Sequence, residues 1–250
     1  MSLSIGDALR DGYERAIAPS GQQFFLAAFV VQLFSAIVTQ SRAARVRTPF
    51  FDQTIAVQPG PLAVGFGTAT LSLLSLLSTI ASLVLILVGI RLFVADATER
   101  IPSMYYRENV VIPLVNLFVG LVVFAVLVGV GTIFLIVPGL FLLTALFFFG
   151  ARIAVEDESF VAGMQSSWRL TRGNRLTLFL LLVAVALVGI GISIVAAVVA
   201  APFAFLSAAL GGVIEIAGTA AGSVYSTAAL SRAYVQLVHD ENVRLNQPEL

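Results

Sequence analysis

The stretch from Leu176 to Ala201 reads LTLFLLLVAVALVGIGISIVAAVVAA and contains no charged residue. An uninterrupted apolar run of about 18 residues or more is typical of a helix that crosses a membrane. Each helical residue advances about 1.5 Å, so this run is long enough to cross a hydrocarbon core about 30 Å thick. We therefore expect a membrane span over residues 174–201, ended by Pro202.

The composition of the whole chain agrees with this interpretation. Of 250 residues, 59% are hydrophobic and only 11% are charged, and the mean hydropathy is +1.00. A soluble domain carries about 25% charged residues. A chain with so few charges cannot cover a surface that faces water. The composition therefore predicts an all-α, polytopic integral membrane helix bundle rather than a soluble domain.

Further apolar runs on both sides of this stretch bring the number of predicted spans to six. They cover residues 22–41, 70–95, 113–131, 138–155, 174–201 and 212–238. Pro113 and Pro138 fall where the third and fourth spans begin, a position that tolerates the missing N–H of proline. Two apolar stretches, 62–70 and 203–211, remain open as interfacial or re-entrant segments.

Two amphipathic segments and a polar tail complete the predicted organisation. In residues 1–21, Ile5, Leu9 and Tyr13 recur at helical spacing among charged residues, which favours a helix on the membrane surface over a solvated, frayed terminus. These early charges also argue against a secretory signal. A second surface helix is expected over residues 157–172, where acids lie at the start and arginines at the end. Residues 239–250 form the expected polar tail.

The arginines predict the orientation of the spans. With six spans both termini lie on one side, and that side collects eleven of the fourteen basic residues. The other side holds the remaining three, which are Arg42, Arg45 and Arg47. Because cytoplasmic loops retain positive charge, we expect a multi-pass protein of the cell membrane with both termini in the cytoplasm.

The sequence lacks the residues that several kinds of chemistry require. A formal net charge of zero argues against nucleic acid as a partner. The absence of cysteine excludes disulfides, thiolate metal sites and cysteine catalysis. The single histidine, His239, has no carboxylate at metal-ligand spacing, and without lysine no glycine-rich phosphate loop of the usual kind can form. We expect no catalytic residue, no metal site and no cofactor.

Glu215 is the candidate functional polar residue, because it is the only acid inside a predicted span. An ionisable group in hydrocarbon usually marks function. However, Glu215 lies seventeen residues from Arg232, about 25 Å along a helix, so it would also fit at the outer interface. It shares a face with Gly218 and Gly222, a pair typical of close helix packing. A hydroxyl stripe on the second span would line a polar cavity with it; the stripe consists of Ser72, Ser75, Thr79 and Ser82.

Two groups of arginines are candidates for contact with lipid. Arg169, Arg172 and Arg175 cluster at the end of the second surface helix, where each charge near an anionic surface contributes about 1 kcal/mol. Arg91 and Arg152 lie at the ends of their spans, from which long side chains can reach headgroup phosphates. The alternative for all five is purely topological, with positive residues retained in the cytoplasm.

Three short motifs resemble a known family. They are Val137-Pro138-Gly139-Leu140, Ala154-Val155-Glu156-Asp157 and the segment 166–175, SSWRLTRGNR. The chain resembles the membrane domain of glycerophosphoryl diester phosphodiesterases and related uncharacterised polytopic proteins of haloarchaea. The resemblance implies about six helices with a surface helix after the fourth span. It carries over no catalytic residue, because nothing here matches the soluble catalytic barrel of that family.

Three hypotheses for the function of the protein remain. The first is a non-enzymatic scaffold, accessory or regulatory component of a membrane process, with membrane lipids and either a membrane protein or a second copy as partners. The alternative is a small transporter or permease component with a polar path near Glu215. A membrane-embedded enzyme acting on lipid is the third, with the fewest residues to support it.

Overall fold

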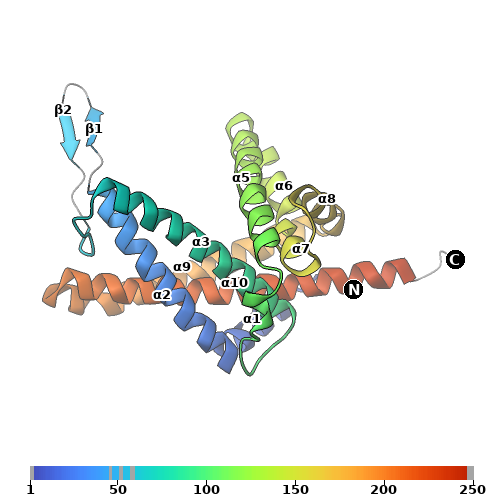
Figure 1. Ribbon diagram of the computed structural model, residues 1–250. Coiled ribbons are helices and arrows are strands. Elements are labelled where there is room, and N and C mark those ends of the chain that lie inside the picture. The colour runs from blue at the N-terminus through green and yellow to red at the C-terminus, as the bar shows by residue number, and fades with distance from the viewer. Residues whose placement is uncertain (1–2, 45–46, 51–52, 57–59, 247–250) are drawn as a thin grey trace. The chain divides into compact units, whose positions relative to one another are not determined.

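The computed structural model describes residues 3–44, 47–50, 53–56 and 60–246. Its helices and strands, in chain order, are α1 (Ile5–Ile17), α2 (Pro19–Ala43), β1 (Arg47–Phe50), β2 (Gln53–Ala56), α3 (Thr68–Val94), α4 (Met104–Arg107), α5 (Val111–Phe134), α6 (Ile136–Leu146), α7 (Phe149–Glu156), α8 (Phe160–Leu170), α9 (Arg175–Leu206) and α10 (Ala208–Asn246) (Figure 1). The predicted loop residues Arg45 and Asp52 and the last four residues of the predicted tail lie outside the described residues.

The prediction of a helical membrane protein with six spans is confirmed. Six helical segments of the described chain are long and apolar enough to cross a membrane: α2, α3, α5, α6 with α7, α9, and α10 as far as Val243. The shortest of these covers 21 residues, which at about 1.5 Å per residue matches the hydrocarbon thickness. The protein is therefore a multi-pass α-helical membrane protein.

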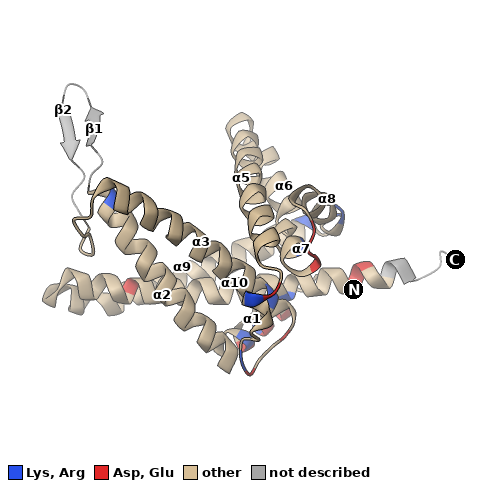
Figure 2. Ribbon diagram, in the orientation of Figure 1, with Lys and Arg blue, Asp and Glu red and all other residues tan. Residues whose placement is uncertain are grey.

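The chain divides into two compact units. The first comprises residues 1–24, 86–188 and 224–250, and the second comprises residues 25–85 and 189–223. Helices α2, α3, α9 and α10 each contribute one end to each unit. Charged residues belong mainly to the first unit, around α1, α7 and α8, whereas α5 and α6 carry none (Figure 2).

Within the first unit, α5 and α6 form an antiparallel hairpin beside α7 and α8 (Figure 1). The hairpin can close because Gly139 has no side chain; a Cβ there would lie 2.7 Å from the Thr132 backbone nitrogen. Its turn is apolar and exposed, with Ile133 84% and Phe134 80% accessible. Such a turn is compatible with a lipid environment, in which exposed apolar side chains carry no hydration cost.

Also in the first unit, α1 packs on α10. Ser4 caps α1, its hydroxyl accepting from the Asp7 N–H, and its own N–H donates to the Gln236 side chain over 3.0 Å. Gly12 lies so close to α10 that a Cβ would be 2.5 Å from the Cα of Ala229. The packed face of α1 is therefore not the predicted apolar one, and Tyr13 remains exposed. The alternative of a frayed terminus is wrong.

The second unit holds α2 against α3 through polar contacts. The hydroxyls of Ser35 and Ser78 lie 2.7 Å apart, and the Arg42 guanidinium donates to the Ser75 hydroxyl over 3.0 Å. Between these helices β1 and β2 pair antiparallel, Arg47 opposite Ala56 and Phe50 opposite Gln53. The sequence predicted only a polar loop in this place.

Several boundaries differ from the predicted ones. Pro202 does not end the fifth span, because α9 continues through it to Leu206. Residues 203–211 are therefore helical except at Ser207, which separates α9 from α10. The expected tail is also helical as far as Asn246. The fourth span, expected to be continuous, breaks between α6 and α7 at residues 147–148.

Candidate functional site

The candidate site lies at the end of α8, and hydroxyl groups fix that helix in place. The Ser167 hydroxyl donates to the Ala145 carbonyl over 3.1 Å and accepts from the Phe148 N–H over 3.1 Å. The Thr171 hydroxyl donates to the same carbonyl over 3.2 Å. Ser167 and Thr171 are fully buried. These bonds satisfy backbone groups at the break between α6 and α7, which would otherwise lack partners.

The turn that follows α8 reverses the chain into α9. Gly173 has φ +90, a left-handed conformation that glycine adopts without steric cost. The Asn174 N–H donates to the Thr171 carbonyl over 3.0 Å, and the Asn174 carbonyl accepts the Leu178 N–H over 2.8 Å. Asn174 therefore directly precedes α9, and only 8% of its surface is exposed.

A polar pocket of about 390 Å³ opens at this turn, which we call the arginine pocket. One wall comes from the end of α8 and the turn, and the other from the last part of α10. Its lining comprises Arg169, Leu170, Arg172, Gly173, Asn174, Leu237, Asp240 and Glu241. Among the residues that the structure describes, no ion pair involves Arg169 or Arg172, and the Asn174 side chain has no hydrogen-bond partner. The pocket thus offers donors on one wall and carboxylates on the other.

Arg175, the third member of the predicted cluster, does not line this pocket. Its guanidinium carbon lies 4.5 Å from the ring centroids of both Phe141 and Trp168. One of its N–H groups donates to the Trp168 carbonyl over 3.3 Å. Such cation–π contacts hold the guanidinium against the aromatic rings. The structure therefore brings two of the three predicted arginines together at the pocket and places the third in a packing role.

A charge network centred on the buried Arg152 lies beside the arginine pocket. Arg152, 8% exposed, donates to both carboxylate oxygens of Glu156 over 2.6 and 2.7 Å and to Glu241 over 2.7 Å. The Tyr234 hydroxyl donates to Glu156 over 2.6 Å. The network joins α7 to α10 and compensates the charge of Glu241, one of the two acids in the pocket wall. It leaves the charge of Arg169 and Arg172 available to a ligand.

The expectation that Arg91 and Arg152 extend to lipid phosphates is wrong. Arg152 is held by the two carboxylates described above. The Arg91 guanidinium donates to the carbonyls of Ala154, Tyr105, Glu108 and Asn109 and pairs with Asp157 over 3.4 Å. Its five N–H groups are thus engaged within the protein. Arg91 ties α3 to α7 and to the segment around α4.

The polar cavity predicted with Glu215 stays a prediction, and the pocket that takes in part of the hydroxyl stripe does not include this residue. A pocket of about 420 Å³ on α2 and α3 includes Arg42, Ser75 and Thr79 but not Glu215. The stripe hydroxyls Ser72, Ser75, Thr79 and Ser82 each donate to the carbonyl four residues earlier. Glu215 is exposed, and no described residue forms an ion pair with it. Gly218 instead packs against Ala196 of α9, which favours the packing interpretation of that face.

Sequence reasoning missed three residues that shape the first unit. Asn174 was noted only as a boundary, although a buried amide at a helix start is a polar group that requires a partner. Tyr234 and Glu241 carried no motif, and only their separation of seven residues, two helical turns, placed them on one face. The tertiary pairing with α7 has no local signal.

Comparison with known proteins adds one finding. Searches of curated proteins and of solved structures returned no match. One family model, described as a domain of unknown function (DUF7847), matches residues 3–237. The match covers five of the six candidate spans in full, most of the sixth and most of the arginine pocket. The resemblance to phosphodiesterase membrane domains is not tested by this match and stays a prediction. The chain belongs to the DUF7847 family of domains of unknown function.

Proposed function

We propose that the protein is a non-enzymatic scaffold or accessory component of a membrane process that holds the phosphate-bearing headgroup of an anionic lipid in the arginine pocket. One observation carries the proposal: Arg169 and Arg172 have no ion pair among the described residues, and they line one pocket with the buried, unpartnered Asn174 amide. Arginine and amide donors suit the oxygens of a phosphate.

The surroundings of the pocket support a location at a membrane surface. Trp168, on α8, is 39% exposed and stacks against Arg175. Tryptophan is enriched where membrane and water meet, because its ring is amphipathic. The ends of α3, α9 and α10 that carry Arg91, Arg175 and Arg232 belong to the same compact unit as the pocket, whereas Arg42 of α2 belongs to the second unit. This supports a cytoplasmic location for the pocket and for both termini, in the cell membrane.

The single tryptophan makes the binding measurable. Purified protein in phosphatidylcholine vesicles should change its Trp168 emission when phosphatidylglycerol is included. Arg169→Gln and Arg172→Gln should each weaken the response about fivefold, because each charge near an anionic surface contributes about 1 kcal/mol. Asn174→Ala should weaken it by a similar factor through the lost hydrogen bond. The matched control is Arg10→Gln, whose side chain is 79% exposed on α1.

Two results would overturn parts of the proposal. Equal affinity in all variants would remove the arginine pocket as a lipid site. Mass spectrometry of the lipid tests the non-enzymatic assignment. Conversion of the lipid to a new species by the wild-type protein would overturn that assignment. Gentle extraction, with identification of co-purifying proteins and the oligomeric state, tests the scaffold role: reproducible recovery of a partner or of a second copy is expected.

A further inference from the structure

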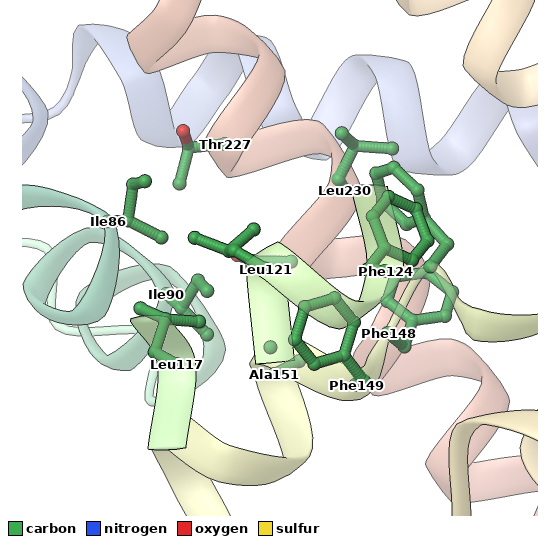
Figure 3. Close-up of a pocket in the computed structure, with 13 residues that line it drawn as sticks. Ile86, Ile90, Leu117, Leu121, Phe124, Phe148, Phe149, Ala151, Thr227 and Leu230 are labelled. Carbon is green, nitrogen blue, oxygen red and sulfur yellow. The ribbon is translucent and has the colours of Figure 1, made fainter. Parts of the chain in front are cut away.

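The first unit contains an apolar cavity of about 240 Å³ that is separate from the arginine pocket (Figure 3). Ile86 and Ile90 of α3 lie on one side of it and Phe124 of α5 on the other, with Leu121 between them (Figure 3). An apolar protein cavity of about 150 Å³ stays dry and accepts benzene, so this larger one can hold a segment of hydrocarbon chain.

The break between α6 and α7 builds much of the wall. Phe147, Phe148 and Phe149 follow one another there, and all three line the cavity. The Phe148 ring packs on Tyr234 with centroids 5.6 Å apart, and the Phe149 ring packs on Phe124 at 5.4 Å. The aromatic wall is therefore held by packing and by the Ser167 hydrogen bond to the Phe148 N–H. A wall fixed in this way preserves the space instead of collapsing into it.

One polar group in the lining points to a ligand that carries an oxygen. Ser231 lines the cavity, is 4% exposed and has no hydrogen-bond partner among the described residues. Other helical hydroxyls of this chain, such as those of Ser72 and Ser82, donate to the carbonyl four residues earlier. An acceptor in the cavity would give this hydroxyl a hydrogen bond, which contributes about 0.5–1.5 kcal/mol.

The arginines next to the lining residues indicate the depth of this cavity in the membrane. On α3, α7 and α10 the lining ends directly before an arginine, at the pairs Ile90-Arg91, Ala151-Arg152 and Ser231-Arg232. All the lining helices belong to candidate spans. The cavity therefore lies just inside the charged boundary, where the first carbons of a lipid chain and the oxygens that attach it are found.

We propose that this cavity binds the upper part of one hydrocarbon chain of a membrane lipid, with the Ser231 hydroxyl donating to an oxygen of that lipid. The occupant is a lipid because the surrounding bilayer supplies long apolar chains with oxygens at this depth. The site is independent of the arginine pocket, with which it shares no lining residue.

A photoreactive phosphatidylcholine with a diazirine early in one acyl chain tests the proposal in vesicles that contain the whole protein. Label is expected on Leu117, Leu121 and Phe124 of α5, which line the cavity. Leu121→Trp, which fills the cavity, should abolish that label. Val122→Trp is the matched control, because Val122 is 50% exposed on the same helix and lies outside the lining. Label on α5 reports the cavity and not the arginine pocket, because no residue of α5 lines that pocket.

Ser231→Ala provides a second measurement that keeps the shape of the cavity. Unlabelled lipid should compete for the site about fivefold less well in this variant, which corresponds to one lost hydrogen bond. Labelling of Leu117 and Phe124 that persists in a folded Leu121→Trp protein would overturn the proposal. If Leu121→Trp does not fold, unchanged competition by unlabelled lipid in Ser231→Ala would by itself overturn the proposal.

Discussion

Arg152 is the residue whose replacement should affect stability most. Replacement by methionine keeps an unbranched chain but removes the guanidinium that donates to Glu156 and Glu241. Two carboxylates would then face each other without a cation, and the Tyr234 hydroxyl would be the remaining described donor to Glu156. Arg152→Met should therefore lower the free energy of unfolding.

The magnitude follows from the burial of the partners. Removal of one member of a buried ion pair costs about 3–5 kcal/mol, because the other charge remains without compensation. The Glu156 and Glu241 side chains are 35% and 34% exposed, so water solvates each in part. After this correction we expect a loss of about 2–3 kcal/mol. For a chain of this size that loss lowers the midpoint of thermal unfolding by about 4–12 °C.

The assay is thermal unfolding in detergent, followed by circular dichroism and by size-exclusion elution after heating. Arg10→Met is a matched control, because Arg10 and Glu14 form an ion pair at the same spacing as Arg152 and Glu156 but are 79% and 47% exposed. The control should change stability by less than about 0.5 kcal/mol. Equal shifts in the two variants, or no shift in Arg152→Met, would refute the inference that the buried network stabilises the first unit.

Further predictions concern close packing and buried hydroxyls. Gly218→Ala should destabilise by about 1–3 kcal/mol because its Cβ would overlap Ala196, whereas Gly191→Ala, with open space around it, should be neutral or stabilising in the same unfolding assay. Gly12→Ala should displace α1 from α10 and increase proteolysis near the N-terminus, and Gly6→Ala should not. Ser167→Ala should cost about 1–3 kcal/mol because the Phe148 N–H loses its acceptor, while Ser193→Ala, which bonds only to its own helix, should cost little.

The fold could be predicted to the level of spans because the bilayer imposes a length on each apolar run. Helix ends were less predictable. Pro202 was expected to stop α9, but the helix continues through it. Membrane helices tolerate an internal proline when neighbouring groups or local adjustments of the helix satisfy the carbonyl that proline leaves unbonded. Pro113 and Pro138 instead fall at the third position of α5 and α6, where no N–H bond is lost.

The candidate site was predictable in part. Charge alone indicated the arginines at the end of α8, and two of them do line one pocket. The contact of Arg175 with Trp168 could not be predicted, because it depends on the direction that α9 takes after Gly173. The sequence marks Gly173 only as a turn. Glu156 lies four residues after Arg152 on the same helix, a spacing that the sequence shows. Glu241, the other partner of Arg152, lies on α10, and neither spacing nor composition reveals that pairing. The N-terminal helix was recognised, but its packed face was not, since that face consists of the small residues Ala8 and Gly12.

The hairpin of α5 and α6 has a consequence for how the chain is assembled. No charged residue lies between Asn109 and Ala151. Moving an arginine or aspartate to the middle of a membrane costs about 2.5–3.5 kcal/mol on insertion scales. The hairpin can enter the bilayer as a pair of helices without moving any charge across it, and its apolar turn at Phe134 adds no polar barrier. Its insertion should therefore need neither a membrane potential nor a prior order among the other helices, which makes it a natural first step in biogenesis.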